Sequence, residues 1–215
     1  MVAMDASVNP RRPYDATLRR ERARQTHEGL LDAALVRFLE SGYAATTVDS
    51  IADDAGVSAA TIFKSYGGKP GLVRALCERA LKGAGPIPAE HRSDELKQAE
   101  PDSRRLIEGW GRLTAEVAPR VAPILLLLRD AASGDPLAAA LHDELDRRRL
   151  KRMSLNARHL VAAGYVRPGL GLAATRDVLW LYSSPELYDL LVRRRRWSVA
   201  RYSQFVADAM IAALL

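Results

Sequence analysis

Apolar residues recur every three or four positions along most of the chain, and the pattern is most regular in residues 46–66. A short helix is predicted from apolar residues at i, i+3, i+4 and i+7, which are Val48, Ile51, Ala52 and Ala55. Thr46 or Thr47 can cap its start, and Gly56 ends it. Ser58 is placed to cap a second helix that runs to Tyr66. The pattern therefore predicts a helix, a tight turn and a second helix.

The second helix of this unit presents small and polar residues. If Ile62 and Tyr66 point inward, the outward positions are Ala59, Ala60, Thr61, Lys64 and Ser65. Small residues let a helix lie deep in a DNA groove, and hydroxyl and ammonium groups bond base edges or phosphates. An ordinary helical hairpin with a polar face has the same spacing. Spacing alone leaves both interpretations open.

Periodicity elsewhere predicts an all-α protein. A long helix is expected from Leu18 or Arg20 to Ser41, with Leu39 in its apolar stripe, and another from about 68 to 82. The Gly- and Pro-rich residues 83–88 break the pattern, and the polar stretch up to Pro101 is expected as a loop or partial helix. Further helices are predicted at about 102–117, 121–132 and 136–163, and in two C-terminal segments from about 172 and 199.

Charge changes this picture modestly. The chain of 215 residues has 32 basic and 26 acidic residues, a balance that fits a polyanionic partner. Asp143 with Arg147, and Glu144 with Arg148, have the i, i+4 spacing of helical ion pairs, so the basic run 147–152 is interpreted as a solvated face. Arginines near the N-terminus precede the helix-turn-helix and can meet phosphates or the minor groove as a flexible arm over residues 1–18.

Catalytic and metal-binding patterns are not found. The only cysteine, Cys77, falls on an apolar helix face, and the four histidines are scattered without metal-ligand spacing. We therefore expect no enzyme, no cofactor and no metal, with a small all-α enzyme or binding module carrying incidental basic charge as the alternative. The longest apolar run, residues 121–128, is too short to cross a membrane, and no signal peptide is seen, so a cytoplasmic location is expected.

The segment from Arg24 to Leu76 resembles the N-terminal domain of the TetR (tetracycline repressor) family of bacterial regulators. The resemblance rests on a run of positions, namely Gly42-Tyr43, Thr46-Thr47-Val48, Ile51-Ala52, Ala55-Gly56-Val57-Ser58, Thr61-Ile62-Phe63, Tyr66 and Lys69. Family members usually have tyrosine at the position of Phe63 and phenylalanine at that of Tyr66, and the tyrosine hydroxyl reaches a phosphate. Pro70-Gly71 also departs from the family pattern.

The resemblance implies a ligand-responsive regulator, most often a repressor, that binds a pseudo-palindromic DNA operator as a homodimer. It implies a DNA-binding domain over residues 19–83 and a ligand-binding and dimerisation domain over residues 84–215. The expected DNA-binding residues are Arg24, Thr46, Thr47, Ser58, Ala59, Ala60, Thr61, Phe63, Lys64, Ser65, Tyr66 and Lys69.

The resemblance also implies an effector pocket and a dimer interface in the C-terminal part. Bulky residues of the predicted helices are candidates for the pocket, namely Trp110, Leu113, Leu127, His142, Met153 and Trp180. The candidates for the interface are Tyr182, Tyr202, Phe205, Val206 and Met210. Core packing explains each of these side chains equally well. The Leu- and Trp-rich composition predicts an apolar or aromatic small-molecule effector.

Overall fold

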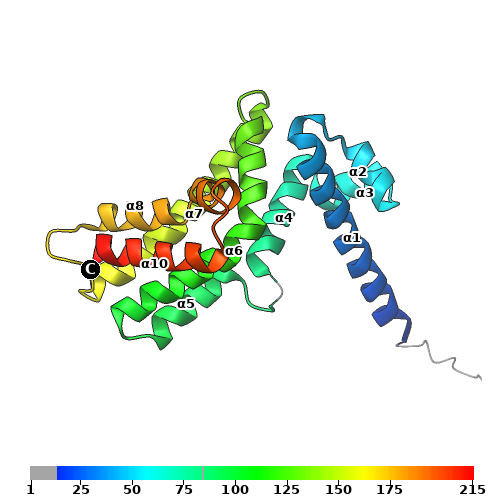
Figure 1. Ribbon diagram of the computed structural model, residues 1–215. Helices are drawn as coiled ribbons and strands as arrows, with labels where there is room; N and C mark the ends of the chain where they lie inside the picture. Colours follow the sequence, from blue (N-terminus) through cyan, green and yellow to red (C-terminus); the bar gives the residue numbers. More distant parts are fainter. Residues whose placement is uncertain (1–13, 84) are drawn as a thin grey trace, which may run out of the picture.

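The computed structural model describes residues 14–83 and 85–215, and within these residues it is built of helices without strands (Figure 1). The all-α prediction is confirmed. The elements are α1 (Tyr14–Ala45), α2 (Val48–Ala55), α3 (Ala59–Tyr66), α4 (Lys69–Lys82), α5 (Ala89–Ala99), α6 (Ser103–Ala131), α7 (Pro136–Ala162), α8 (Leu172–Tyr182), α9 (Pro185–Tyr188), the π-helix η1 (Asp189–Arg194) and α10 (Val199–Leu214). Figure 1 shows α1 to α3 at one end of the molecule and α5, α8 and α10 at the other.

Helix caps place several of these boundaries where the sequence predicts them. The side chain of Asp135 accepts hydrogen bonds from the backbone N–H groups of Leu137 and Ala138, and Pro136 occupies the first turn of α7. A proline is tolerated there because its missing N–H has no partner within the helix. Asp102 caps α6 in the same way through the N–H of Arg105.

Two hydrophobic cores hold the helices together. The first joins α1 to α4 with the end of α6 and the start of α7, and includes Phe38, Leu72, Leu128 and Leu141. The second joins α6, α7, α8, α9 and α10, and includes Trp110, Leu160 and Tyr202. The chain leaves α4 at Gly83, but the first core draws residues from both sides of that position.

Helix α6 differs most from the sequence-based prediction. Two helices were expected over 102–117 and 121–132, whereas α6 continues through Pro119 and Pro123. Each proline removes one intrahelical hydrogen bond, which usually bends or ends a helix. Here the helix is packed against α1, α4 and α10, and the contacts on several sides offset the two missing bonds.

Two other segments also differ. Residues 14–18, expected in the flexible arm, form the first turns of α1, whereas residues 1–13 of that arm lie outside the described part of the chain. Leu39 is 49% exposed and does not join the inward stripe of α1. The polar residues before Pro101 form a complete helix, α5.

Candidate DNA-binding surface and internal cavity

The turn between α2 and α3 is built by caps on both sides. Thr47 accepts a hydrogen bond from the N–H of Ser50, and the Ser50 hydroxyl accepts one from the N–H of Thr47, which is a capping box. Gly56 adopts a left-handed conformation with φ 64° and donates to the carbonyls of Ala52 and Asp53. Ser58 then caps α3 by accepting from the N–H of Thr61 at 3.2 Å. The two short helices therefore meet in a helix-turn-helix.

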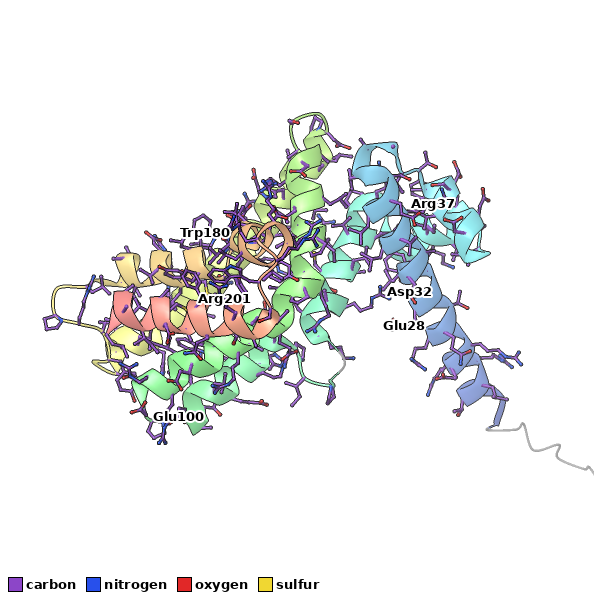
Figure 2. The ribbon with its side chains drawn as sticks, viewed as in Figure 1. Glu28, Asp32, Arg37, Glu100, Trp180 and Arg201 are labelled. Carbon is purple, nitrogen blue, oxygen red and sulfur yellow. The ribbon has the colours of Figure 1, made fainter. Side chains whose placement is uncertain are left out.

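Charged pairs join α1 to α2 and α1 to α4, and Figure 2 labels the α1 residues that take part. Arg37 of α1 binds Asp54 of α2 through two nitrogens, with Nη2 at 2.7 Å from Oδ1. Arg79 of α4 lies 2.8 Å from Asp32 of α1. The first pair fixes α2 on α1, and the second fixes α1 on α4, against which α3 packs.

Helix α3 is anchored by one side chain and exposed along most of the others. Ile62 is 0% exposed and packs into the first core. The exposed residues are Ser58, Ala60, Thr61, Phe63, Lys64 and Ser65. Ala59 is half-buried and packs against the core, so its predicted outward position is corrected. Within the described residues, the Lys64 ammonium has no hydrogen-bond or salt-bridge partner.

Thr46 is a corrected assignment. Its side chain is 2% exposed, and its hydroxyl donates to the carbonyl of Gly42 at 2.7 Å, so it cannot contact DNA. Thr47 is exposed and supplies the cap of α2. Thr46 is therefore the buried residue of the pair and Thr47 is the helix cap, whereas the sequence allowed either threonine to be the cap.

Three further residues expected at DNA already have partners within the chain. The Tyr66 hydroxyl lies 2.7 Å from Nδ1 of His27 on α1, and burial raises the pKa of this tyrosine. Lys69 donates to the carbonyl of Tyr43 at 2.8 Å, with its Nζ 4.4 Å from the centre of the Tyr43 ring. Arg24 is exposed on α1 and pairs with Glu21.

The turn between α3 and α4 is unusually close. Gly67 and Gly68 both have positive φ, at 71° and 104°. A Cβ on Gly71 would lie 1.5 Å from the carbonyl oxygen of Tyr66, so no side chain fits at this position. Pro70 is accommodated in the first turn of α4. The Pro-Gly pair that departs from the family pattern therefore permits α4 to start directly against the end of α3.

A cavity of about 190 Å³ lies between α4, α5, α6 and α7, with α8 and α10 closing it. Its apolar surface comes mainly from α6, through residues such as Trp110, Leu113, Val121 and Leu125. Helix α4 contributes Cys77, Glu78 and Leu81. Burial raises the pKa of the Cys77 thiol to about 12. Since α4 also packs against α3, the cavity wall is continuous with the helix-turn-helix.

Arginines of α7 form the polar part of the cavity wall. Arg152 binds both carboxylate oxygens of Asp94, at 2.6 and 3.0 Å, and also contacts Ser93 and Asn156. The Arg152 guanidinium and the Lys97 ammonium hold the pKa of Asp94 far below its usual range. Arg149 donates to the carbonyl of Trp180 and lies 4.6 Å from the centre of its ring. Figure 2 shows Trp180 beside the crowded side chains of this region.

These arginines correct the interpretation of residues 147–152 as a solvated face. The side chains of Arg149 and Arg152 are only 16% and 12% exposed. The expected partners also differ: Glu144 pairs with Arg74 of α4 at 2.7 Å, and Arg148 lies 3.8 Å from Glu78. A signal was available, because Leu141, Leu145, Arg149, Arg152, Asn156 and Leu160 recur at helical spacing along one stripe of α7.

The predicted pocket residues divide into two groups. Trp110, Leu113 and Met153 line the cavity. Leu127 instead packs against the first core, His142 lies beside Asp143, and Trp180 stacks on Arg149 outside the cavity lining.

Most of the predicted interface residues are interior ones. Tyr202, Val206 and Met210 are at most 3% exposed and belong to the second core, which corrects their assignment to a dimer interface. These residues lie on α10, which packs closely against α6. A Cβ added to Gly111 of α6 would lie only 2.8 Å from Cβ of Ala207 on α10. Phe205 is 37% exposed, and the ring of the half-buried Tyr182 lies 6.5 Å from it. Other apolar residues exposed on α8 and α10 are Leu172, Leu181 and Val199.

Other classes of site find no support in the described residues. No cluster of three or more His, Cys, Asp or Glu side chains there could hold a metal ion. Nor is any helix within the described ranges both long and apolar enough to cross a membrane.

The helix-turn-helix formed by α2 and α3 is an arrangement found in DNA-binding proteins. Residues 30–76 match the sequence model of the bacterial regulatory proteins of the tetR family. Over these residues the chain is similar to the DNA-binding part of the tetR-family regulators.

The chain is similar to known regulators both in sequence and in fold. The uncharacterized HTH-type transcriptional regulator YvkB of Bacillus subtilis (strain 168) is 40% identical over 74 residues, which are 34% of this chain and 39% of that relative. The chain thus spans about two fifths of YvkB in this match. The FadR regulator of Bacillus subtilis in complex with stearoyl-CoA has a TM-score of 0.69 and 17% identity, with 88% of this chain and 100% of that chain covered.

The second solved structure is the SmeT–triclosan complex. It has a TM-score of 0.68 and 20% identity, covering 89% of this chain and 92% of that chain. At these identities the two structures establish the shared fold alone.

Proposed function

We propose that this protein is a ligand-responsive transcription regulator that binds a pseudo-palindromic DNA operator as a homodimer and acts as a repressor. The observation that carries the proposal is the presentation of α3, which is anchored by the buried Ile62 while Thr61, Lys64 and Ser65 stay exposed. A helix that is fixed on one side and lined with small and polar groups on the other suits the major groove.

The contacts divide by their chemistry. Lys64 is assigned to phosphate or base edges, because its ammonium is exposed and has no partner among the described residues. Thr61 and Ser65 are assigned to base edges, and Ser58, Thr47 and Arg24 to the phosphate backbone. None of the exposed hydroxyls can make a bidentate contact to guanine, so DNA shape contributes to specificity.

Fluorescence anisotropy tests DNA binding. The purified protein is titrated with genomic fragments, including the region upstream of its own gene, at two salt concentrations. Selective binding that persists at the higher salt supports the proposal. Weak binding that is unselective and vanishes at higher salt contradicts it, because general charge attraction alone behaves in this way.

Lys64→Ala sharpens the same experiment. Loss of one phosphate contact should weaken binding to all sequences and reduce the salt slope by about one unit. Lys151→Ala is the matched control, since Lys151 is an exposed lysine on α7 and the charge change is identical. Equal effects of the two changes would contradict the assignment of α3 as the recognition helix. Thr61→Ala should instead alter the preference at one base position.

The proposed dimer forms through the exposed faces of α8 and α10. These two helices pack side by side, and they expose Leu181 and Phe205. Covering such side chains with a second copy removes apolar surface from water. Sedimentation equilibrium should give a dimer for the native chain and a monomer for Leu181→Arg/Phe205→Glu. Leu137→Glu, at the 66% exposed Leu137 of α7, should remain dimeric.

The proposed effector is an apolar or aromatic compound that enters the cavity. The support is the lining by Trp110, Leu113 and Leu125, together with the apolar or acyl ligands named for the SmeT and FadR complexes. Because α4 contributes to both the cavity wall and the first core, a ligand can change the position of α3. It weakens DNA binding only as far as it binds the DNA-incompetent conformation more tightly.

Calorimetry tests the effector proposal. A panel of apolar and aromatic compounds should include binders that also release DNA. Ala118 lines the cavity and is half-buried. Ala118→Phe therefore places a ring in the cavity, and it should abolish ligand binding while DNA binding persists. Binding of charged metabolites only, or ligand binding unaffected by this change, would contradict the proposal.

A further inference from the structure

A second hollow lies on the surface of the C-terminal part, apart from the cavity and from the helix-turn-helix. Its lining residues are Leu126, Arg129, Asp130, Asp189, Arg193, Arg194 and Arg196. None of them lines the apolar cavity. In Figure 1 the orange turns of α9 and η1 lie over α6, well separated from the blue and cyan helices α1 to α3. Neither the proposed DNA contact nor the proposed effector cavity uses this hollow.

The backbone around the hollow is uncommon in two respects. The segment from Asp189 to Arg194 is a π-helix. This form is rare in proteins, and where it occurs it is often part of a functional site. Among the residues that the structure describes, Arg196 is the single non-glycine residue with positive φ, at 58°. The N–H groups of Arg195 and Trp197, on either side of it, bond back to the carbonyls of Leu190 and Leu191. Left-handed conformations at such residues persist only where the surroundings impose them.

Positive charge exceeds negative charge in the hollow. Four arginines and two aspartates line it, and Glu186 beside Arg129 adds a third carboxylate, which leaves an excess of one positive charge. Asp189 is mostly buried, with its side chain 13% exposed. Its carboxylate accepts one hydrogen bond from Arg193 and one from Arg194, at 3.0 and 2.7 Å. Since a guanidinium has five N–H donors, most donors of these two arginines remain free. Asp189 thus fixes the positions of Arg193 and Arg194 and leaves most of their N–H donors available to a ligand.

The remaining arginines differ in how far they are satisfied. Arg129 is held by Asp130 at 2.9 Å and by Glu186 at 3.3 Å. Arg196 is exposed and, within residues 14–83 and 85–215, has no hydrogen-bond or salt-bridge partner. Four guanidinium groups held near one another without enough carboxylates repel each other, and an anion that bridges them would remove this repulsion.

We propose that this hollow binds the phosphoryl group of a phosphate-bearing small molecule. A carboxylate carries one charge and two oxygens, whereas a phosphate monoester carries about two charges and three terminal oxygens near pH 7. The excess of positive charge and the several guanidinium forks with free donors match the phosphoryl group better. Free phosphate, pyrophosphate and a phosphorylated metabolite share this chemistry, and the inference is independent of DNA binding.

Isothermal titration calorimetry of the full chain at constant ionic strength tests the proposal, with orthophosphate, pyrophosphate and acetate as probes. We expect pyrophosphate and orthophosphate to bind at one site per chain and acetate not to bind. Tighter binding of pyrophosphate than of orthophosphate would favour a ligand with more than one phosphoryl group, and equal affinities would favour a single phosphoryl group. No heat with either phosphate at millimolar concentration, or equal binding of acetate, overturns the proposal.

A pair of charge-matched variants distinguishes a site from general attraction. Arg196→Gln removes a lining arginine, and we expect about tenfold weaker pyrophosphate binding. Arg195→Gln removes the adjacent exposed arginine, which does not line the hollow, and should change binding by less than about twofold. Equal losses in the two variants would overturn the proposal. Thermal unfolding with and without pyrophosphate confirms that both variants are folded, and the DNA-binding test is unaffected by either outcome.

Discussion

The hydroxyl of Tyr66, at the end of α3, lies 2.7 Å from Nδ1 of His27 on α1. This contact joins the proposed recognition helix to the helix that braces it. Tyr66→Phe should lower the free energy of unfolding by about 1 kcal/mol, the usual net value of one hydrogen bond. DNA affinity should change little, because the hydroxyl already has a partner within the chain.

Urea unfolding of Tyr66→Phe, His27→Ala and the double variant measures the coupling between the two residues. The double variant should lose less than the sum of the two single losses. A fall in DNA affinity without any loss of stability would instead place the hydroxyl at the DNA.

Gly71 cannot carry a side chain, since a Cβ there would lie 1.5 Å from the carbonyl oxygen of Tyr66. The clash is with backbone, so no rotation of a side chain relieves it. Gly71→Ala should destabilise the protein by about 2 kcal/mol or more and weaken DNA binding by shifting α3 against α4. Thermal unfolding and anisotropy measure the two effects.

Gly29→Ala is a control that should change the free energy of unfolding in the opposite direction. Gly29 is exposed within α1, and a Cβ there would have no neighbour within 4 Å. Alanine is favoured over glycine in a helix by about 0.5–1 kcal/mol, so this change should stabilise the protein. Destabilisation by both changes would show that glycine flexibility, and not the close approach at Gly71, determines the outcome.

Cys77 should be nearly inert in the folded protein. Burial raises the pKa of its thiol to about 12, so very little of the thiol is ionised at pH 8. Alkylation by iodoacetamide at that pH should be at least about a hundredfold slower in the native protein than in urea. An effector in the cavity should slow the reaction further, because Cys77 is part of the wall. Similar rates with and without urea would contradict the burial of this thiol.

The Asp94 carboxylate should contribute stability that depends on pH. Its pKa is lowered in the folded state, first by the hydrogen bond from Arg152. A lowered folded-state pKa means that the stabilisation is present above the unfolded pKa, near 3.9, and is lost as the pH falls further toward the folded value. Asp94→Asn should therefore cost about 1 kcal/mol at pH 7, a modest value because the carboxylate side chain is 40% exposed to water.

The difference between native chain and Asp94→Asn should shrink when unfolding is measured below pH about 4. Asp143→Asn, at a carboxylate that is 66% exposed on α7, should show little effect at either pH. A difference that stays constant down to low pH would mean that the carboxylate charge is not its cause.

Local signals made much of the fold predictable. Ser58, Gly56 and Asp135 act on backbone within a few residues of themselves, and the ends that they predict for α2, α3 and α7 agree with the structure. The helix break predicted at Pro119 was wrong. The prediction considered only the hydrogen bond that proline removes, and not the packing of α6 against α1, α4 and α10.

The site was less predictable, because its contacts join distant parts of the chain. The i, i+4 rule paired Arg148 with Glu144, whereas Glu144 binds Arg74, seventy residues away in sequence. Arg152 likewise finds Asp94, which belongs to a helix that was not firmly predicted. Tyr202 was a candidate for the dimer interface or for the core, and a sequence cannot say whether such an apolar residue faces its own chain or a second copy.

The first hydrophobic core crosses Gly83, since Leu128 and Leu141 pack with Phe38 and Leu72. A chimaeric regulator made by joining residues up to Gly83 to the effector domain of another protein would therefore receive an unmatched half of this core. Such an exchange should transfer DNA specificity intact only if the partner residues at the end of α6 and the start of α7 travel with α1 to α4. The practical unit of exchange is a packing unit, and it is discontinuous in the sequence.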